Sequence, residues 1–199
     1  MRHSGVVRAT HWIITLAFLA LLVTGVEIVI SHPRFYWGET GNSGTPTLFR
    51  IPIPSSRATV PTGYGYVLPD QNGWSRYLHF EAAWAAVLTG ALYWIWGVAR
   101  GHFRFGAYNP TQKAAYLGVI FVLAPVMVWT GLAMSPGFTA AAPWAVTFWG
   151  GQQSARTIHF FATVLLVLFL GAHLIMVWRT GWRRLVGAMI TGRMEETHE

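Results

Sequence analysis

Four apolar segments, each about 20 residues long, constrain the fold of this chain more than any other feature. They run from about residue 11 to 30, 79 to 98, 114 to 134 and 157 to 178. A helix of about this length crosses the hydrocarbon core of a bilayer. Only 11% of the residues are charged, compared with about a quarter in soluble domains. The sequence therefore predicts an all-α integral membrane protein, a four-helix up-and-down bundle that forms a single transmembrane domain over residues 1–199.

Basic residues predict the orientation of the spans. Nine of the fourteen lysines and arginines lie in the tails or between the second and third segments. Because such residues are enriched on the cytoplasmic side, we expect both termini in the cytoplasm and the protein in the bacterial inner membrane. The positive charge is thus a topology signal and gives no reason to expect nucleic acid. The first segment is too long for a signal-peptide core and lacks a cleavage site, so we expect a permanent span.

The segment 31–75 is predicted to form a long extracytoplasmic loop between the first two spans. Its prolines and glycines are too frequent for a long helix, and its many aromatic residues argue against disorder. An ordered loop or a short β-like cap is expected. A loop of this length usually has a function, and we weigh a lid on the bilayer surface against a docking face for an extracytoplasmic partner. Between the third and fourth spans, residues 138–149 predict one short interfacial helix.

Four histidines lie inside the predicted spans, where ionisable groups are costly and usually functional. They are His11, His79, His159 and His173. His173 follows His159 by fourteen residues, which on a helix is nearly four turns and a rise of about 21 Å. Because successive spans run in opposite directions, His79 and His159 are expected near the outer face. By the same argument, His11 and His173 are expected near the cytoplasmic face.

Two histidine pairs at matching depths suit two haems, one in each half of the membrane. Each pair would supply the two axial imidazoles of one iron. The chain has no cysteine, which excludes thioether attachment, so we expect two non-covalent b-type haems with bis-histidine ligation. Zinc also takes histidine ligands, but the split between two depths and the absence of nearby carboxylates or thiolates argue against it.

Arginines and glycines complete the predicted haem sites. Arg8, Arg76 and Arg156 each precede a histidine by one helical turn, where a guanidinium can pair with haem propionates. The competing explanation is snorkelling of arginine at helix ends. Gly25 and Gly90 would present bare backbone to a macrocycle, although glycine also serves ordinary helix packing in membranes.

The number and spacing of these histidines resemble those of the di-haem membrane cytochrome b subunits of nickel–iron hydrogenases, formate dehydrogenases and related molybdopterin oxidoreductases. The run Tyr-Asn-Pro-Thr-Gln-Lys at residues 108–113 is similar to a run near the quinone site in that family. The resemblance implies that Asn109, Gln112 and Lys113 contact an exchangeable quinone. A helix cap with a basic interface anchor explains these three residues equally well. The run at 32–38 resembles the subgroup with an extracytoplasmic molybdopterin partner.

The resemblance implies an electron-transfer subunit of an oxidoreductase complex. An extracytoplasmic partner would dock on the long loop and the 136–156 connection. Electrons would pass between this partner and a quinone on the cytoplasmic side by way of the two haems. The chain itself would supply the quinone-reducing site. Two other classes stay open. One is a stand-alone, quinone-coupled oxidoreductase acting on a small external molecule such as superoxide, and the other is a haem-free bundle serving as an anchor or transporter. Assembly into an oligomer is compatible with the sequence.

Overall fold

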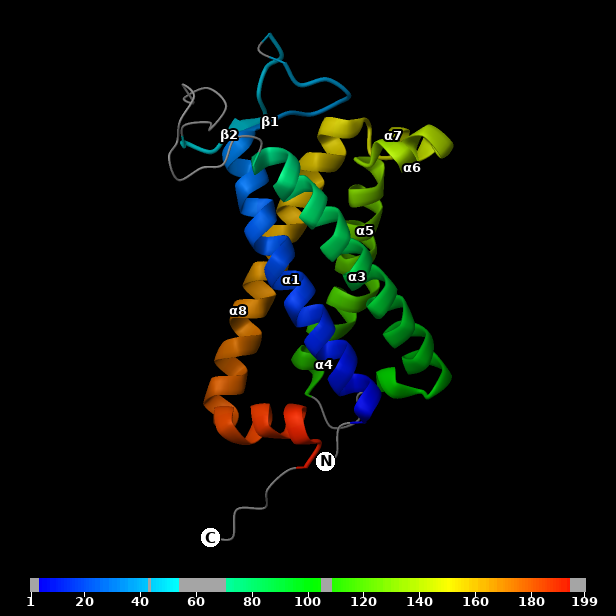
Figure 1. The fold of residues 1–199 in the computed structure, drawn as a ribbon, viewed down its shortest axis with the longest axis vertical. Coiled ribbons are helices and arrows are strands. Elements are labelled where there is room, and N and C mark those ends of the chain that lie inside the picture. The colour runs from blue at the N-terminus through cyan, green and yellow to red at the C-terminus, as the bar shows by residue number, and fades with distance from the viewer. Residues whose placement is uncertain (1–3, 43, 54–70, 105–108, 194–199) are drawn as a thin grey trace. The chain divides into compact units, whose positions relative to one another are not determined.

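The computed structural model describes residues 4–42, 44–53, 71–104 and 109–193, and helices account for 79% of it (Figure 1). Within these described residues, four helical segments are long and apolar enough to cross a membrane. They are Gly5–Ser31, Gly73–Ala99, Pro110–Ala133 and Gln152–Thr191. The predictions of an all-α fold and of four spanning segments are therefore confirmed.

The first two spans extend beyond their apolar runs. Helix α1 (Gly5–Ser31) begins before His11, and α3 (Gln71–Ala99) begins well before His79. No proline interrupts either approach, so the helical hydrogen bonds continue through the polar residues. The histidines therefore lie inside helices instead of opening them. After α3, a short 3₁₀ helix η1 (His102–Arg104) leads toward the third span.

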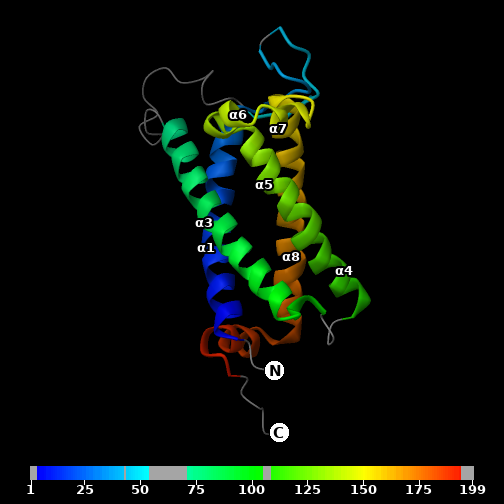
Figure 2. The same cartoon turned by 90° about the vertical axis from the view of Figure 1, so that its right-hand side faces the viewer.

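The third span contains an irregular turn. Helix α4 (Pro110–Gly118) passes through the π-helix η2 (Val119–Leu123) into α5 (Ala124–Ala133), and Figure 2 shows α4 and α5 end to end. The backbone N–H of Ala124 donates to the Val119 carbonyl, five residues back. Pro125 follows directly and has no N–H to donate. The wider turn before this proline preserves a continuous span.

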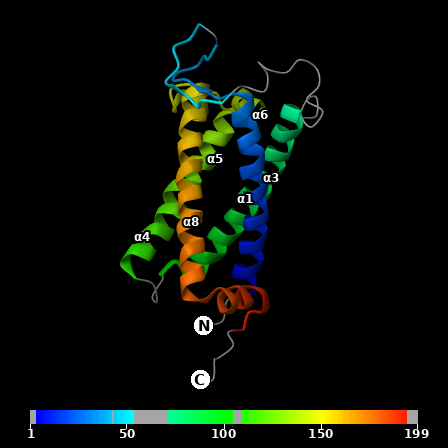
Figure 3. The same cartoon turned by 90° about the vertical axis from the view of Figure 1, so that its left-hand side faces the viewer.

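The fourth span ends in a turned C-terminal segment. Helix α8 (Gln152–Thr191) has helical backbone angles except at Gly181, where φ is 119° and ψ is 85°, a conformation that glycine adopts without a Cβ penalty. The segment after Gly181 lies across the start of α1 (Figure 3). There the indole Nε1 of Trp12 donates to the Met189 carbonyl over 3.1 Å. Between His159 and His173 the helix is uninterrupted, as the spacing argument requires.

The long helices divide between two compact units. Unit 1 consists of Met1–Val26, Gly73–Gly106 and Phe169–Glu199, and unit 2 consists of Glu27–Asn72 and Ala107–Leu168. Three of the four candidate histidines belong to unit 1, and His159 belongs to unit 2.

The described part of the long loop forms a small cap in unit 2. Strand β1 (Arg34–Phe35) pairs antiparallel with β2 (Phe49–Arg50). Of the two alternatives predicted for the loop 31–75, residues 32–53 favour the β-like cap. The predicted loop is too long at both ends, because Ser31 belongs to α1 and residues 71–75 belong to α3, and residues 54–70 lie outside the described residues. Phe35 is almost fully buried, stacked on Phe49 and packed against Phe160 of α8.

The cap also supplies hydrogen bonds to the start of α8. The Gly38 carbonyl accepts from the backbone N–H groups of Gln153 and Ser154, and the carboxylate of Glu39 accepts from that of Gln152 over 3.2 Å. The first N–H groups of a helix have no partner within it, and negative charge is favourable there. The loop therefore acts as the N-terminal cap of the fourth span.

The connection between the third and fourth spans differs from the prediction of one short helix over 138–149. It contains two, α6 (Pro136–Ala141) and α7 (Trp144–Thr147). Ala142 separates them with φ −136° and ψ 68°, because the residue before a proline, here Pro143, is driven out of the α region.

Candidate functional site

In unit 1, the imidazole of His79 lies against α1. The hydroxyl oxygen of Thr24 is 2.9 Å from His79 Nδ1 and 2.7 Å from the carbonyl oxygen of Ala20, one turn earlier. A Cβ built on the adjacent Gly25 would lie 3.7 Å from His79 Cε1, which is ordinary van der Waals contact. Of the sequence-predicted site residues, Gly25 and His79 are thus brought together.

In unit 2, His159 has the same surroundings on a different helix. The hydroxyl oxygen of Thr130, in α5, is 2.9 Å from His159 Nδ1 and 2.7 Å from the carbonyl oxygen of Val126. A Cβ built on Gly131 would lie 3.5 Å from His159 Cε1. The two units therefore each contain a Thr-Gly pair facing a histidine, with matching atoms and nearly matching distances.

These contacts favour a proton on Nδ1 of both rings. A hydroxyl has one proton, and a backbone carbonyl only accepts hydrogen bonds. Thr24 and Thr130 therefore donate to their carbonyls and accept from the Nδ1–H of His79 and His159. In a neutral imidazole the lone pair then resides on Nε2. A metal-binding histidine needs this arrangement, with one ring N–H held by an outer partner.

Sequence analysis missed Thr24, Thr130 and Gly131. The available signal was the recurrence of Thr-Gly in the first and third spans, at 24–25 and 130–131. That dipeptide also occurs at 40–41, 62–63, 89–90, 180–181 and 191–192, so the pattern alone does not identify a site.

The other two histidines belong to unit 1 and pack against aromatic rings. The ring of His11 meets Trp12 edge-on, with centroids 5.3 Å apart and planes at 85°. The ring of His173 stacks on Phe169, with centroids 6.3 Å apart and planes at 18°. A Cβ built on Gly90, in α3, would meet no described atom within 4 Å. The same holds for Gly118 and Gly171, so the role of Gly90 beside a haem stays a prediction.

The three predicted arginines have different surroundings. Arg156 donates to the backbone carbonyls of His32 and Arg34, and its guanidinium lies 4.8 Å from the ring centroid of Phe35. It therefore ties the cap to α8. Arg8 is partly buried, and its Nε atom has no hydrogen-bond partner among the described residues. Arg76 is exposed. A propionate role stays a prediction for all three.

The predicted quinone-contact run begins α4. Asn109 and Gln112 form a capping box, in which Asn109 Oδ1 accepts from the Gln112 backbone N–H over 2.8 Å and Gln112 Oε1 accepts from that of Asn109 over 3.4 Å. The helix-cap explanation is therefore confirmed for these two residues. Lys113 follows in the first turn, and Tyr108 lies outside the described residues. Quinone contact stays a prediction.

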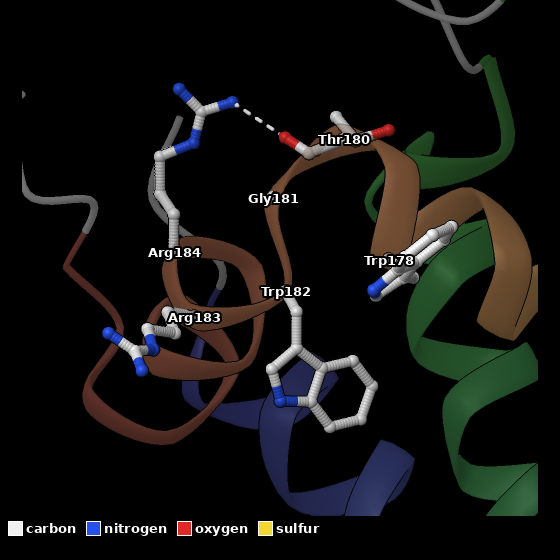
Figure 4. Close-up of a pocket in the computed structure, with 6 residues that line it drawn as sticks. All are labelled: Trp178, Thr180, Gly181, Trp182, Arg183 and Arg184. Carbon is white, nitrogen blue, oxygen red and sulfur yellow. Dashed lines mark hydrogen bonds between the residues drawn. The ribbon is translucent and has the colours of Figure 1, made fainter.

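An open pocket lies at the break in α8 (Figure 4). It is lined by Trp178, Thr180, Gly181, Trp182, Arg183 and Arg184. The guanidinium of Arg184 donates to the Thr180 carbonyl over 3.4 Å. None of the lining residues is a candidate haem ligand, and tryptophan with arginine is typical of a membrane interface. This pocket is therefore separate from the histidine sites.

Comparison with known proteins assigns the family. The model of the prokaryotic cytochrome b561 family matches residues 2–192. A protein of Azospira oryzae described as "putative protein-methionine-sulfoxide reductase subunit YedZ1" is 24% identical over 207 residues, which cover 88% of this chain and 89% of the relative. No solved structure matches the chain significantly. The match includes all four spans and all four candidate histidines, and it confirms the resemblance to membrane cytochromes b. This multi-pass bacterial membrane protein therefore belongs to the prokaryotic cytochrome b561 family, whose members bind b-type haem.

Proposed function

We propose that the chain is a two-haem electron carrier between an extracytoplasmic oxidoreductase and the membrane quinone pool. In this proposal His79 and His159 bind the outer haem, and His11 and His173 bind the inner one. A bound haem supplies a one-electron iron couple whose potential depends on its ligands and their surroundings. The observation that carries the proposal is the matching Thr–His–Gly arrangement, because it prepares Nε2 of both outer histidines to bind a metal.

Further features of the described residues fit a flat, anionic cofactor. Gly25 and Gly131 leave bare backbone beside the two histidine rings, where longer side chains would compete with a macrocycle. The Nε atom of Arg8 is buried without a described hydrogen-bond partner, and a haem propionate is an acceptor of the right charge. Arg8 lies one turn before His11, so we assign it to the inner haem.

We place the docking face for the partner on the cap and the α7 region of unit 2. Four large apolar side chains there are more than half exposed. They are Trp37, Leu48, Trp144 and Phe148. Aromatic residues are enriched at protein interfaces, and the cap is held to α8 by hydrogen bonds instead of lying free as a lid. The Azospira oryzae relative is described as a reductase subunit, which supports an oxidoreductase as the partner.

The docking face can be tested separately from haem binding. The double variant Trp144→Ser/Phe148→Ser should reduce co-purification of the partner with the detergent-extracted chain and leave its haem spectrum unchanged. Trp182→Ser, an exposed tryptophan in the C-terminal segment, is the matched control and should co-purify as the wild type does. Undiminished co-purification of the double variant would contradict this docking face.

We place quinone exchange at the cytoplasmic start of α4, beside Lys113, with both termini in the cytoplasm. The motif resemblance and the positive charge of the tails support this placement. Asn109 and Gln112 would then hold the turn through their capping box, while the Lys113 ammonium would offer hydrogen bonds to a quinone oxygen.

The whole proposal is tested on the purified native protein. A pyridine haemochrome assay should give two haems b per chain, and a quinol should reduce them. Fewer than two haems would contradict the two-site proposal, and failure of any quinol to reduce them would contradict quinone coupling. Rapid haem reduction by superoxide in the isolated chain, without a partner, would instead favour the stand-alone oxidoreductase.

A further inference from the structure

Thr24 and Thr130 contact the same ring atom of the two histidines assigned to the outer haem. In both cases the distance from Oγ1 to Nδ1 is 2.9 Å, and the threonines are 2% and 0% exposed. The contacts occur in different units and between different helices. The same threonine hydroxyl contact to a candidate histidine ligand therefore occurs twice, once between α1 and α3 and once between α5 and α8.

The position of each hydroxyl is fixed by its own helix. Thr24 Oγ1 donates to the Ala20 carbonyl and Thr130 Oγ1 donates to the Val126 carbonyl, each over 2.7 Å. Such a bond to the preceding turn selects one rotamer of a β-branched side chain. The acceptor offered to each imidazole is therefore stationary, which restricts rotation of the ring as well as the site of its proton.

We propose that Thr24 and Thr130 are paired positioning residues of the outer haem, which orient both axial imidazoles and lower the midpoint potential of that haem. The inference rests on the proposed function and deepens it. An imidazole that donates its outer N–H to an acceptor becomes a more basic ligand. A more basic ligand favours ferric over ferrous iron, and this lowers the midpoint potential. Hydrogen bonding around the axial ligands is one of the factors that set the potential of a haem.

Removing one hydroxyl at a time tests this directly. Thr24→Val and Thr130→Val keep the side-chain volume but leave each Nδ1–H without its hydroxyl acceptor. Both should raise the midpoint potential of the same redox transition. A threefold change in the ferric-to-ferrous affinity ratio per lost hydrogen bond corresponds to about 28 mV, at about 59 mV per tenfold change for one electron. Because both threonines act on one iron, the double variant should shift by the sum of the single shifts.

Ring orientation has its own spectroscopic readout. In ferric low-spin haem, the largest g value in the electron paramagnetic resonance spectrum depends on the angle between the two imidazole planes. Both valine variants should move this value for the outer haem only. Thr24→Ser and Thr130→Ser retain an oxygen acceptor and should restore the wild-type potential and g value.

Two other threonines serve as matched controls. Thr163 Oγ1 donates to the His159 carbonyl over 2.9 Å, and Thr15 Oγ1 donates to the His11 carbonyl over 2.8 Å. Both hydroxyls therefore bond the backbone of a candidate ligand residue instead of its ring Nδ1. Thr163→Val and Thr15→Val should leave the outer haem's potential unchanged.

Each outcome is decisive. Unchanged potential and g value in both valine variants would overturn the proposal, as would serine variants that behave like the valine ones. Shifts of two different transitions would show that the threonines do not act on one haem. Loss of the outer haem in the valine variants, with retention in the serine variants, would support positioning. A colourless wild-type protein would refute the proposed function itself.

Discussion

The two histidines that we assign to the outer haem and the two that we assign to the inner haem carry the same imidazole in different surroundings. His79 and His159 each contact a threonine hydroxyl through Nδ1, whereas His11 and His173 each pack against an aromatic ring. A hydroxyl fixes a proton and raises ligand basicity, while an aromatic ring acts through packing and burial. Identical axial ligands therefore do not imply identical haems, since outer hydrogen bonds and burial also tune an iron site.

Removing one ligand from each class gives the largest expected effect. His159→Ala should eliminate the outer haem and leave the inner one, and His173→Ala should do the reverse, because a b-type haem without one axial imidazole is poorly retained. Pyridine haemochrome assays should fall from two haems to one, and redox titration should identify which transition is lost. His32→Ala, in the cap, is the control. Retention of both haems in either ligand variant would show that the pairing is wrong.

Filling the bare backbone beside an outer ligand should have the next largest effect. A Cβ at Gly131 would already be in van der Waals contact with the His159 ring, 3.5 Å from Cε1, so the longer side chain of Gly131→Leu would occupy the space beside that ring. Overpacking typically costs about 1–3 kcal/mol, so outer-haem content should fall while the inner haem is kept. Gly118→Leu is the control in the same span, since a Cβ there meets no described atom within 4 Å. Equal haem contents in the two variants would contradict a role for the bare backbone at Gly131 in haem binding.

Removing a positive charge near the outer haem should give a smaller, purely electrostatic effect. Arg76→Ala and Arg156→Ala should lower the outer midpoint potential, because a nearby cation favours the reduced state. A unit charge about 10 Å away at an effective dielectric constant of about 20 contributes roughly 1.7 kcal/mol, or about 70 mV at about 59 mV per tenfold change.

The two arginine variants also separate charge from anchoring. Arg156→Ala should in addition loosen the cap, because it removes the bonds to the His32 and Arg34 carbonyls, and limited proteolysis should cut the loop faster. The Arg76 side chain is exposed, so Arg76→Ala should change the potential alone. An unchanged outer transition in both variants would remove the propionate role.

Replacing an aromatic neighbour of an inner ligand should have the smallest effect. Phe169→Leu removes the ring stacked on His173, a contact of a kind worth about 0.5–1.5 kcal/mol. Thermal unfolding should begin at a slightly lower temperature, and only the inner haem's midpoint potential should change. A shift confined to the outer haem's transition would contradict the assignment of His173 to the inner haem.

Much of the membrane architecture could be predicted, because the bilayer imposes it locally. A span must be apolar over about 20 residues and satisfy its backbone hydrogen bonds internally, so four apolar runs give four helices. The helix ends were less predictable. α1 and α3 continue into polar residues that retain helical hydrogen bonds, and Pro143 divides the expected interfacial helix in two.

The candidate site could be predicted only in part. Histidines inside apolar runs are conspicuous because their burial is costly, and Gly25 was found from its offset to His11. Thr24 and Thr130 were not found. A helical threonine that donates to the carbonyl of its preceding turn is common, and the sequence does not indicate which other side chain its hydroxyl contacts. Likewise Arg156 reads as a propionate ligand in the sequence, yet its guanidinium bonds two loop carbonyls in the structure.

The sequence by itself determined the four spans, the four histidines inside them and the absence of thioether attachment, since each follows from residue type and order along one chain. Only the tertiary structure decided which ring nitrogen of His79 and His159 holds the proton. That choice depends on hydroxyls 55 and 29 residues away, brought within 2.9 Å by the packing of separate helices. The physical reason is that a bilayer favours helices wherever the local composition is apolar. A histidine tautomer, in contrast, depends on which hydrogen-bonding group the tertiary fold places beside the ring.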